Sequence, residues 1–168
     1  GPTLDFHPFI SDRVILIAPL DHPFASREIV EPEELLDQIF ILREEGSGTR
    51  EVAELGLNEL EISLDHLKTI LTLGNSEAIA LSVQEGLGIG FVSQLIVSRL
   101  VNGKVAPVKV RSLELHQDIY IGCDRNRMVA TAQTAFWDFV TNPQNPVLKK
   151  LNREVGAQDG FLLANVDD

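Results

Sequence analysis

Short apolar runs alternate with amphipathic helical patterns along most of this chain. Runs rich in leucine and β-branched residues predict strands at 14–18, 40–42, 69–73, 89–92, 105–110 and 119–121. Several of these runs are apolar on both faces, which is typical of strands in a parallel sheet that helices cover. The alternation therefore predicts an α/β fold.

The predicted helices lie between these strands, at 33–38, 50–60, 76–85 and 131–140. Pro32 precedes the first helix, and Asn75 with Ser76 forms a cap pair at the start of the third. Gly86 is expected to end the third helix in the left-handed conformation. The fourth helix stops before Pro143 and carries one apolar stripe, formed by Ala132, Ala135, Phe136, Phe139 and Val140.

The composition is that of a globular domain with an acidic surface. Apolar residues make up 44% of the 168 positions, which is enough to bury one sizeable core or two small lobes. The formal net charge of -11 disfavours binding of a nucleic-acid backbone by this segment. No apolar run approaches the roughly 20 residues that a membrane span needs, so no contact with a membrane is expected.

The single cysteine, Cys123, excludes an internal disulfide framework and a cysteine-rich metal site. The chain fits a reducing cytoplasm better than an export compartment. Its start has neither the pattern of a secretion signal nor an initiating methionine, so we expect a fragment of a longer protein. The tail from Pro146 to Asp168 is expected to hold one further helix and a loose end.

A strand, a glycine-rich turn and a helix follow one another over residues 40–60, and the turn consists of Gly46, Ser47, Gly48 and Thr49. The glycines allow close approach of a ligand, while the hydroxyls and the free amides of the first helical turn would face it. Such a helix end carries partial positive charge and suits a carboxylate or a phosphate. The alternative is that Ser47 or Thr49 only caps the helix.

The same order of strand, polar turn and helix start recurs over residues 72–79, with Asn75 and Ser76 at the helix start. Ligands of open α/β proteins bind at the carboxyl ends of the strands. Two such turns in one sheet therefore predict a ligand site more strongly than either turn alone. The glycines of residues 86–90 instead indicate a helix stop that leads into a buried strand.

Residues for catalysis are few. Glu44 and Glu45 are adjacent, and adjacent side chains of an extended chain point in opposite directions, so the two cannot flank one substrate. No histidine has a metal-ligand partner at helical spacing, and surface positions are expected for all four, which are His7, His22, His66 and His116. The sequence predicts no metal, no cofactor and no enzymatic activity.

Four blocks give the chain a family resemblance through their order and spacing. They are residues 11–25, then Glu-Glu-Gly-Ser-Gly-Thr-Arg at 44–50, Gly-Asn-Ser-Glu-Ala-Ile at 74–79 and Val-Gln-Glu-Gly-Leu-Gly-Ile-Gly-Phe-Val-Ser at 83–93. Over residues 6–141 the chain resembles the effector-binding domain of LysR-type transcriptional regulators. This resemblance implies a type 2 periplasmic-binding-protein-like fold, with one nearly complete Rossmann-like lobe plus the closing strand and helix of a second lobe.

The resemblance also implies a division of the chain. Residues 1–8 would end lobe I at the hinge, 9–110 would form the effector-binding lobe II, 111–141 would return to lobe I, and 142–168 would be a tail. The strand at 68–73 and the helix at 50–60 would lie near a subunit interface. The effector-binding residues that the resemblance implies are Ser47, Gly48, Thr49, Asn75 and Ser76, with Ile121 and Gly122 on the hinge side.

The implied function is effector sensing: a small, often anionic metabolite binds between two lobes and changes their closure. The differential affinity behind such shifts is commonly ~1–3 kcal/mol. The implied partners are promoter DNA, bound through an N-terminal winged helix-turn-helix outside this chain, and further copies in a homodimer or homotetramer. The block at 44–50 is especially like regulators of carbon fixation and sulfur assimilation, which indicates a metabolic carboxylate or phosphate.

Two other functions stay open at this point. One is a solute-binding protein that feeds a transporter, which would need a signal peptide and a complete first lobe. The other is an enzyme on a related two-lobed fold, in which Thr49 and Arg50 would orient a substrate carboxylate. No convincing general base accompanies these two residues, so the enzyme is the weaker alternative.

Overall fold

The computed structural model describes residues 4–124, 131–142, 144–146 and 149–150. Residues 13–117 form one compact unit, and residues before 13 and after 117 belong to a second. The strands are β1 (Leu4–Pro19), β2 (Ile39–Arg43), β3 (Lys68–Leu73), β4 (Ile89–Ser93), β5 (Val105–Val108) and β6 (Leu115–Asp124). The α-helices are α1 (Gly48–Glu59), α2 (Ser76–Gln84), α3 (Gln94–Leu100) and α4 (Thr131–Thr141).

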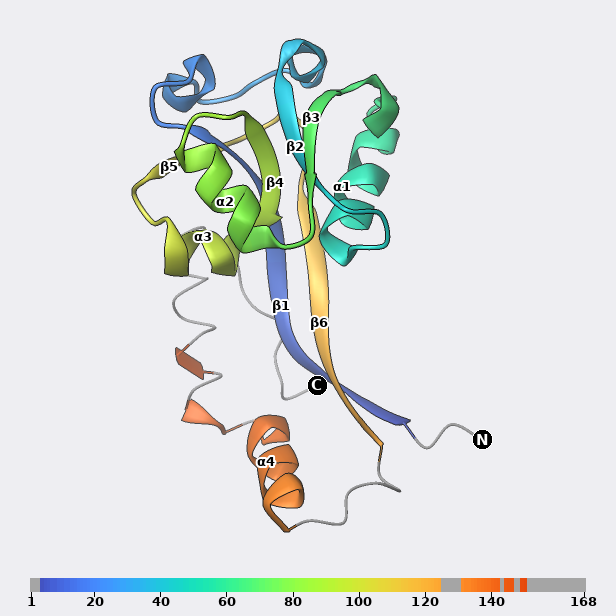
Figure 1. The fold of residues 1–168 in the computed structure, drawn as a ribbon. Coiled ribbons are helices and arrows are strands. Elements are labelled where there is room, and N and C mark those ends of the chain that lie inside the picture. Colours follow the sequence, from blue (N-terminus) through green and yellow to red (C-terminus); the bar gives the residue numbers. More distant parts are fainter. Residues whose placement is uncertain (1–3, 125–130, 143, 147–148, 151–168) are drawn as a thin grey trace. The chain divides into compact units, whose positions relative to one another are not determined.

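The described strands form one sheet in the order β3-β2-β4-β1-β5, with β6 paired to β1. β2 is parallel to both β3 and β4, as the apolar runs predict. β1 runs antiparallel to β4 and β5, a direction that the sequence pattern does not reveal. Because β2, β3 and β4 are parallel, their carboxyl ends meet at one edge of the sheet, and α1, α2 and α3 each begin there (Figure 1).

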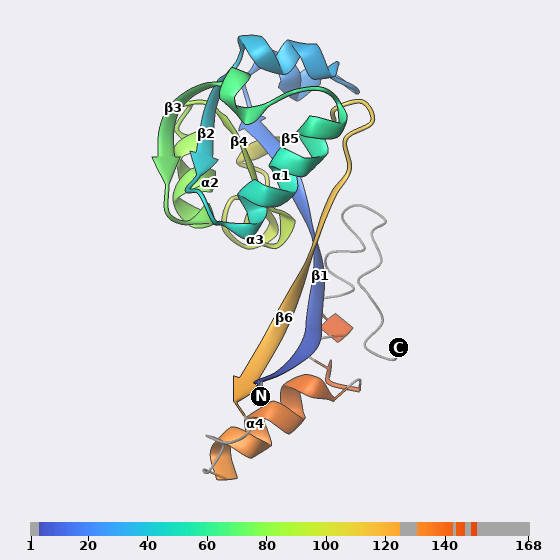
Figure 2. The same cartoon turned by 90° about the vertical axis from the view of Figure 1, so that its right-hand side faces the viewer.

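Helices cover both faces of the sheet within residues 13–117. Helix α1 lies on one face and helices α2 and α3 lie on the other (Figure 1), and Figure 2 shows α1 in front of the strands with α2 behind them. A separate apolar core fills each space. On the α1 side, Phe40 and Phe91 stack with their ring centroids 5.9 Å apart. On the opposite side, Ile41 of β2 packs with Ile79 and Val83 of α2.

Helix α1 shows how the sequence pattern sets this packing. Ala53 and Leu57 lie four residues apart and are buried, while Glu51 and Glu54 remain exposed. Helix α2 is capped by Asn75 as predicted, and Gly86 adopts a φ of 86° just after its end. These local signals place both helices within two residues of their predicted bounds.

The structure corrects several details of the predicted elements. The helix expected at 33–38 is a 3-10 helix at Pro32–Asp37, with a capping box between Glu31 and Glu34. Helix α3 is not among the predicted elements. The strand expected at 105–110 ends at Val108, and Val110 instead forms an isolated bridge with Val30.

His22 is not the surface residue that the sequence predicts. It is partly buried and caps the 3-10 helix at Pro23–Ser26, because its Nδ1 accepts a hydrogen bond from the amide of Phe24 at 2.9 Å. Its Nε2 lies 2.7 Å from Oε1 of Gln38. The ring is thus a structural element of its turn.

In the second unit, Phe136 and Phe139 of α4 are 60% and 50% exposed, so this part of the predicted apolar stripe faces outward. The side chains of Ala132, Val140 and Cys123, and the tail beyond residue 150, lie outside the described residues. Within the described ranges, every helix is too short or too polar to cross a bilayer.

Candidate anion-binding site

The start of α1 follows directly from the carboxyl end of β2. Gly46 adopts a φ of 87°, a left-handed conformation that glycine tolerates, and turns the chain toward the helix. The Oγ of Ser47 accepts a hydrogen bond from the amide of Arg50 at 3.0 Å, so Ser47 is the cap of α1 and Thr49 is not. The amides of Gly48 and Thr49 have no hydrogen-bond acceptor among the described residues.

The start of α2 repeats this arrangement at the end of β3. The Oδ1 of Asn75 accepts a hydrogen bond from the amide of Ala78 at 2.7 Å. Ser76 is the first residue of the helix, and only 9% of its surface is exposed. Among the described residues, the amides of Ser76 and Glu77 also lack an acceptor. Both helix starts therefore present partial positive charge at the same edge of the sheet.

The parallel pairing of β2 with β3 brings the two helix starts together. Arg43 at the end of β2 is in register with Leu73 at the end of β3, and the amide of Glu44 donates to the carbonyl of Leu73 at 3.1 Å. The Arg43 side chain then bridges the two turns, because its Nη1 donates to Oγ of Ser76 at 2.9 Å. Within this unit, the structure thus places on one edge the predicted residues Ser47, Gly48, Thr49, Asn75 and Ser76.

Arg43 also lies at this candidate site, a position that the sequence patterns do not predict. Its guanidinium is paired with the neighbouring Glu44, with Nε to Oε2 at 3.2 Å and Nη2 to Oε1 at 3.1 Å. The arginine side chain is 18% exposed and the glutamate side chain 44%. Hydrogen bonds from Arg43 are the main reason that the pKa of the Glu44 carboxyl lies below its ordinary value. A charged arginine and a charged carboxylate therefore stand together at the helix starts.

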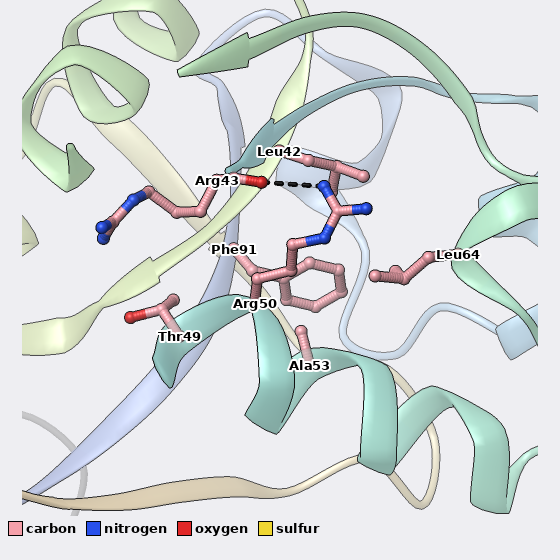
Figure 3. Close-up of a pocket in the computed structure, with 7 residues that line it drawn as sticks. All are labelled: Leu42, Arg43, Thr49, Arg50, Ala53, Leu64 and Phe91. Atoms are coloured by element: carbon pink, nitrogen blue, oxygen red, sulfur yellow. Dashed lines mark hydrogen bonds between the residues drawn. The ribbon is translucent and has the colours of Figure 1, made fainter. Parts of the chain in front are cut away.

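A small cavity lies beside this edge, between α1 and the strands β2 and β4 (Figure 3). Its volume is about 10 Å³, which is room for one water molecule at most. Nη1 of Arg50 donates to the carbonyl oxygen of Arg43 at 2.8 Å, while the guanidinium of Arg43 points the opposite way (Figure 3). A metabolite does not fit this cavity, so the candidate site is the surface at the two helix starts.

The Thr49 side chain lines the small cavity at the start of α1. Its hydroxyl is 3.4 Å from Oε1 of Gln117, a long hydrogen bond that leaves the oxygen able to accept another. The residue itself is 6% exposed, so its side chain is mostly shielded from solvent.

Ile121 and Gly122 lie on β6 in the other unit. Gly122 is exposed, and a methyl group added there would meet the ring of Phe6 at 2.8 Å, so the strand and that ring are closely packed. The side chain of Ile121 lies outside the described residues. The role of these two residues in effector binding stays a prediction.

Among the described residues, no group of three histidine, cysteine or acidic side chains could hold a metal ion.

Comparison with known proteins identifies the family. A family model described as the LysR substrate binding domain matches residues 1–143. The chain belongs to this family. The RuBisCO operon transcriptional regulator of Acidithiobacillus ferrooxidans is 35% identical over 133 residues, which are 79% of this chain and 42% of that protein. An uncharacterized helix-turn-helix transcriptional regulator of Methanocaldococcus jannaschii is 34% identical over 131 residues, or 77% and 44% of the two chains.

This LysR substrate-binding domain thus spans less than half the length of either relative. Among solved structures, the regulatory domain of CcmR from Synechocystis PCC6803 in complex with 2-PG matches with a TM-score of 0.68 and 25% identity, over 88% of this chain and 68% of that one. A substrate-binding protein from Clostridium perfringens with bound phosphate matches with a TM-score of 0.66 and 18% identity, over 90% and 70%. These similarities confirm the predicted type 2 periplasmic-binding-protein-like α/β fold.

Proposed function

We propose that this chain is the effector-binding part of a LysR-type transcriptional regulator and binds a small anionic metabolite at the carboxyl edge of β2 and β3. One observation carries the proposal: two helix starts with unpartnered amides follow neighbouring parallel strands and are bridged by Arg43. Amides, hydroxyls and a guanidinium are all donors, and a ligand that accepts from several of them is a carboxylate or a phosphate.

The relatives support this ligand class. The CcmR regulatory domain was solved with 2-PG, which is 2-phosphoglycolate, a molecule with one phosphate and one carboxylate. A ligand with two anionic groups suits an edge with two helix starts. One relative is a regulator of a RuBisCO operon, which supports an effector from carbon metabolism for this chain. We therefore propose 2-phosphoglycolate as the first compound to test.

The whole regulator would act in the cytoplasm on promoter DNA, through a DNA-binding domain outside this chain. It would form a homodimer or homotetramer, with β3 and α1 at the interface. β3 is an edge strand on which Ile70 and Leu71 are 53% and 37% exposed, and Leu55 on α1 is 67% exposed. An edge strand with exposed apolar residues is a surface that association would cover.

Isothermal titration calorimetry with 2-phosphoglycolate tests the binding proposal. Thr49→Val keeps the size of the side chain but removes its hydroxyl, and it should weaken binding by roughly 1–3 kcal/mol. Thr69→Val makes the same change on the exposed start of β3, at the opposite end of the strand, and should leave the affinity unchanged. Equal affinities of wild type and Thr49→Val would exclude Thr49 from the site, and absence of binding by all three proteins would contradict the proposed ligand.

A further inference from the structure

The pair of Arg43 and Glu44 has the geometry of an arginine that holds a bound anion. Two nitrogens of the guanidinium face the two oxygens of one carboxylate, at 3.2 and 3.1 Å. A planar guanidinium presents this same fork to the carboxylate or phosphate of a ligand. Arg43 also donates a hydrogen bond from Nη1 to Ser76 Oγ. The guanidinium that Glu44 occupies therefore lies at the start of α2.

The Glu44 carboxylate also lies next to the turn that precedes α2. A methyl group added at Gly74 would be 4.0 Å from Oε2 of Glu44, so this oxygen lies over the glycine with no side chain between them. The backbone of Glu44 is fixed there by its hydrogen bond to the carbonyl of Leu73. A negative charge of the protein itself therefore occupies the guanidinium of Arg43, beside the turn that leads into α2.

Glu44 is paired with the guanidinium of Arg43, and its charged neighbours Glu45, Glu77 and Arg50 are not. Glu45 and Glu77 are exposed, and the structure gives neither a salt bridge among the described residues. Arg50 uses its guanidinium on the carbonyl of Arg43 and points away from the fork (Figure 3). The Glu44 side chain is 44% exposed and the Arg43 side chain 18%, so water reaches the carboxylate and screens part of its attraction to the guanidinium.

We propose that Glu44 is an intramolecular competitor of the effector: its carboxylate occupies the Arg43 guanidinium to which an anionic group of the effector binds. This inference rests on the proposed function, since it concerns the same site. It assigns Arg43 as a residue that contacts the effector. It also gives Glu44 a role in specificity, because only a ligand with sufficient negative charge displaces a carboxylate that is already in place.

The test is calorimetric titration of 2-phosphoglycolate and, separately, of inorganic phosphate into the wild type, three single variants and one double variant of the chain. Glu44→Gln keeps the shape of the side chain and removes its charge, and it should tighten binding about three- to tenfold. Glu45→Gln removes the same charge one residue away, and it should change the affinity less than twofold. Arg43→Gln should weaken binding about tenfold or more, and adding Glu44→Gln to it should then have no further effect.

Each outcome has a definite meaning. Tighter binding by Glu44→Gln alone, with no gain in affinity when the same change is made in the Arg43→Gln background, supports the competition. If Glu44→Gln and Glu45→Gln change the affinity equally, the effect comes from the lower negative charge of the protein and not from the Arg43 pair, which would overturn the inference. Weaker binding by Glu44→Gln would make Glu44 a positioning residue, which also overturns it. Binding by none of the proteins would refute the proposed anion site itself, and circular dichroism would check that each variant is folded.

Discussion

Gly90 in β4 provides the sharpest stability test of the described fold, because any side chain there meets atoms on two elements. A methyl group added at Gly90 would lie 2.9 Å from the carbonyl oxygen of Ile41 and 2.9 Å from Cγ2 of Ile79. Relaxed contacts need roughly 3.5 Å. Ile41 is a backbone neighbour in the parallel pair of β2 and β4, and Ile79 is fully buried, so neither atom can move freely.

We therefore expect Gly90→Ala to lower the free energy of unfolding. Overpacking of a core costs about 1–3 kcal/mol, and the backbone contact places this site in the upper part of that range. Alanine also lowers the conformational entropy of the unfolded chain, which offsets about 0.5–1 kcal/mol of this loss of stability. The net loss is about 2 kcal/mol, which corresponds to a decrease of roughly 4–8 °C in melting temperature.

The measurement is thermal unfolding followed by circular dichroism, with Gly48→Ala as the matched control. No atom lies within 4 Å of a methyl group added at Gly48, and its φ is not left-handed, so this variant should be as stable as the wild type or slightly more stable. A Gly90→Ala protein that melts within about 1 °C of the wild type would refute the packing of α2 on β4. Equal destabilisation by Gly48→Ala would show that the two glycines are not distinguished by their surroundings.

Two further predictions concern the surface. Ile70→Lys should shift the chain from an oligomer to a monomer in sedimentation velocity, because it places a charge on the exposed edge of β3; a monomeric wild type would contradict the proposed interface. The pKa of Glu34 lies below its ordinary value of 4.5, chiefly through the hydrogen bond from Arg27, so its contribution to stability is present above that value and is lost as the pH falls through the folded pKa. The difference in urea midpoint between wild type and Glu34→Gln should therefore be larger at pH 7 than at pH 3, and an equal difference at both values would exclude the ion pair as its cause.

The sequence predicts the parts of the fold that depend on local signals. Helix α2 has an asparagine cap at one end and a left-handed glycine at the other, and both lie within the helix or next to it. Helix α3 has weaker signals, since its residues 94–100 include several aliphatic residues and directly follow a strand. Two valines four positions apart, Val97 and Val101, followed by Gly103, are the sequence pattern that could have revealed this helix. In the structure both valines are buried and Gly103 has a φ of 75°.

The candidate site was predictable only in part, for the same reason. The two helix starts are visible in the sequence because caps and glycines are local. The role of Arg43 is not visible, because its partner Ser76 is 33 positions away and only the parallel pairing of β2 with β3 brings them together. The sequence also could not decide whether Ser47 or Thr49 caps α1, since both hydroxyls are within one residue of the helix start.

All the residues assigned to the site in the larger unit come from one continuous stretch, residues 43–76. The contact between Arg43 and Ser76 closes a loop of 33 positions, and the entropy cost of closing a loop rises only slowly with its length. The geometry of the anion site is therefore set by the order β2, α1, β3 and α2. A variant that unfolds this stretch or the sheet beneath it should therefore lose the anion site as a whole, whereas a substitution of one donor should remove only that donor's contact.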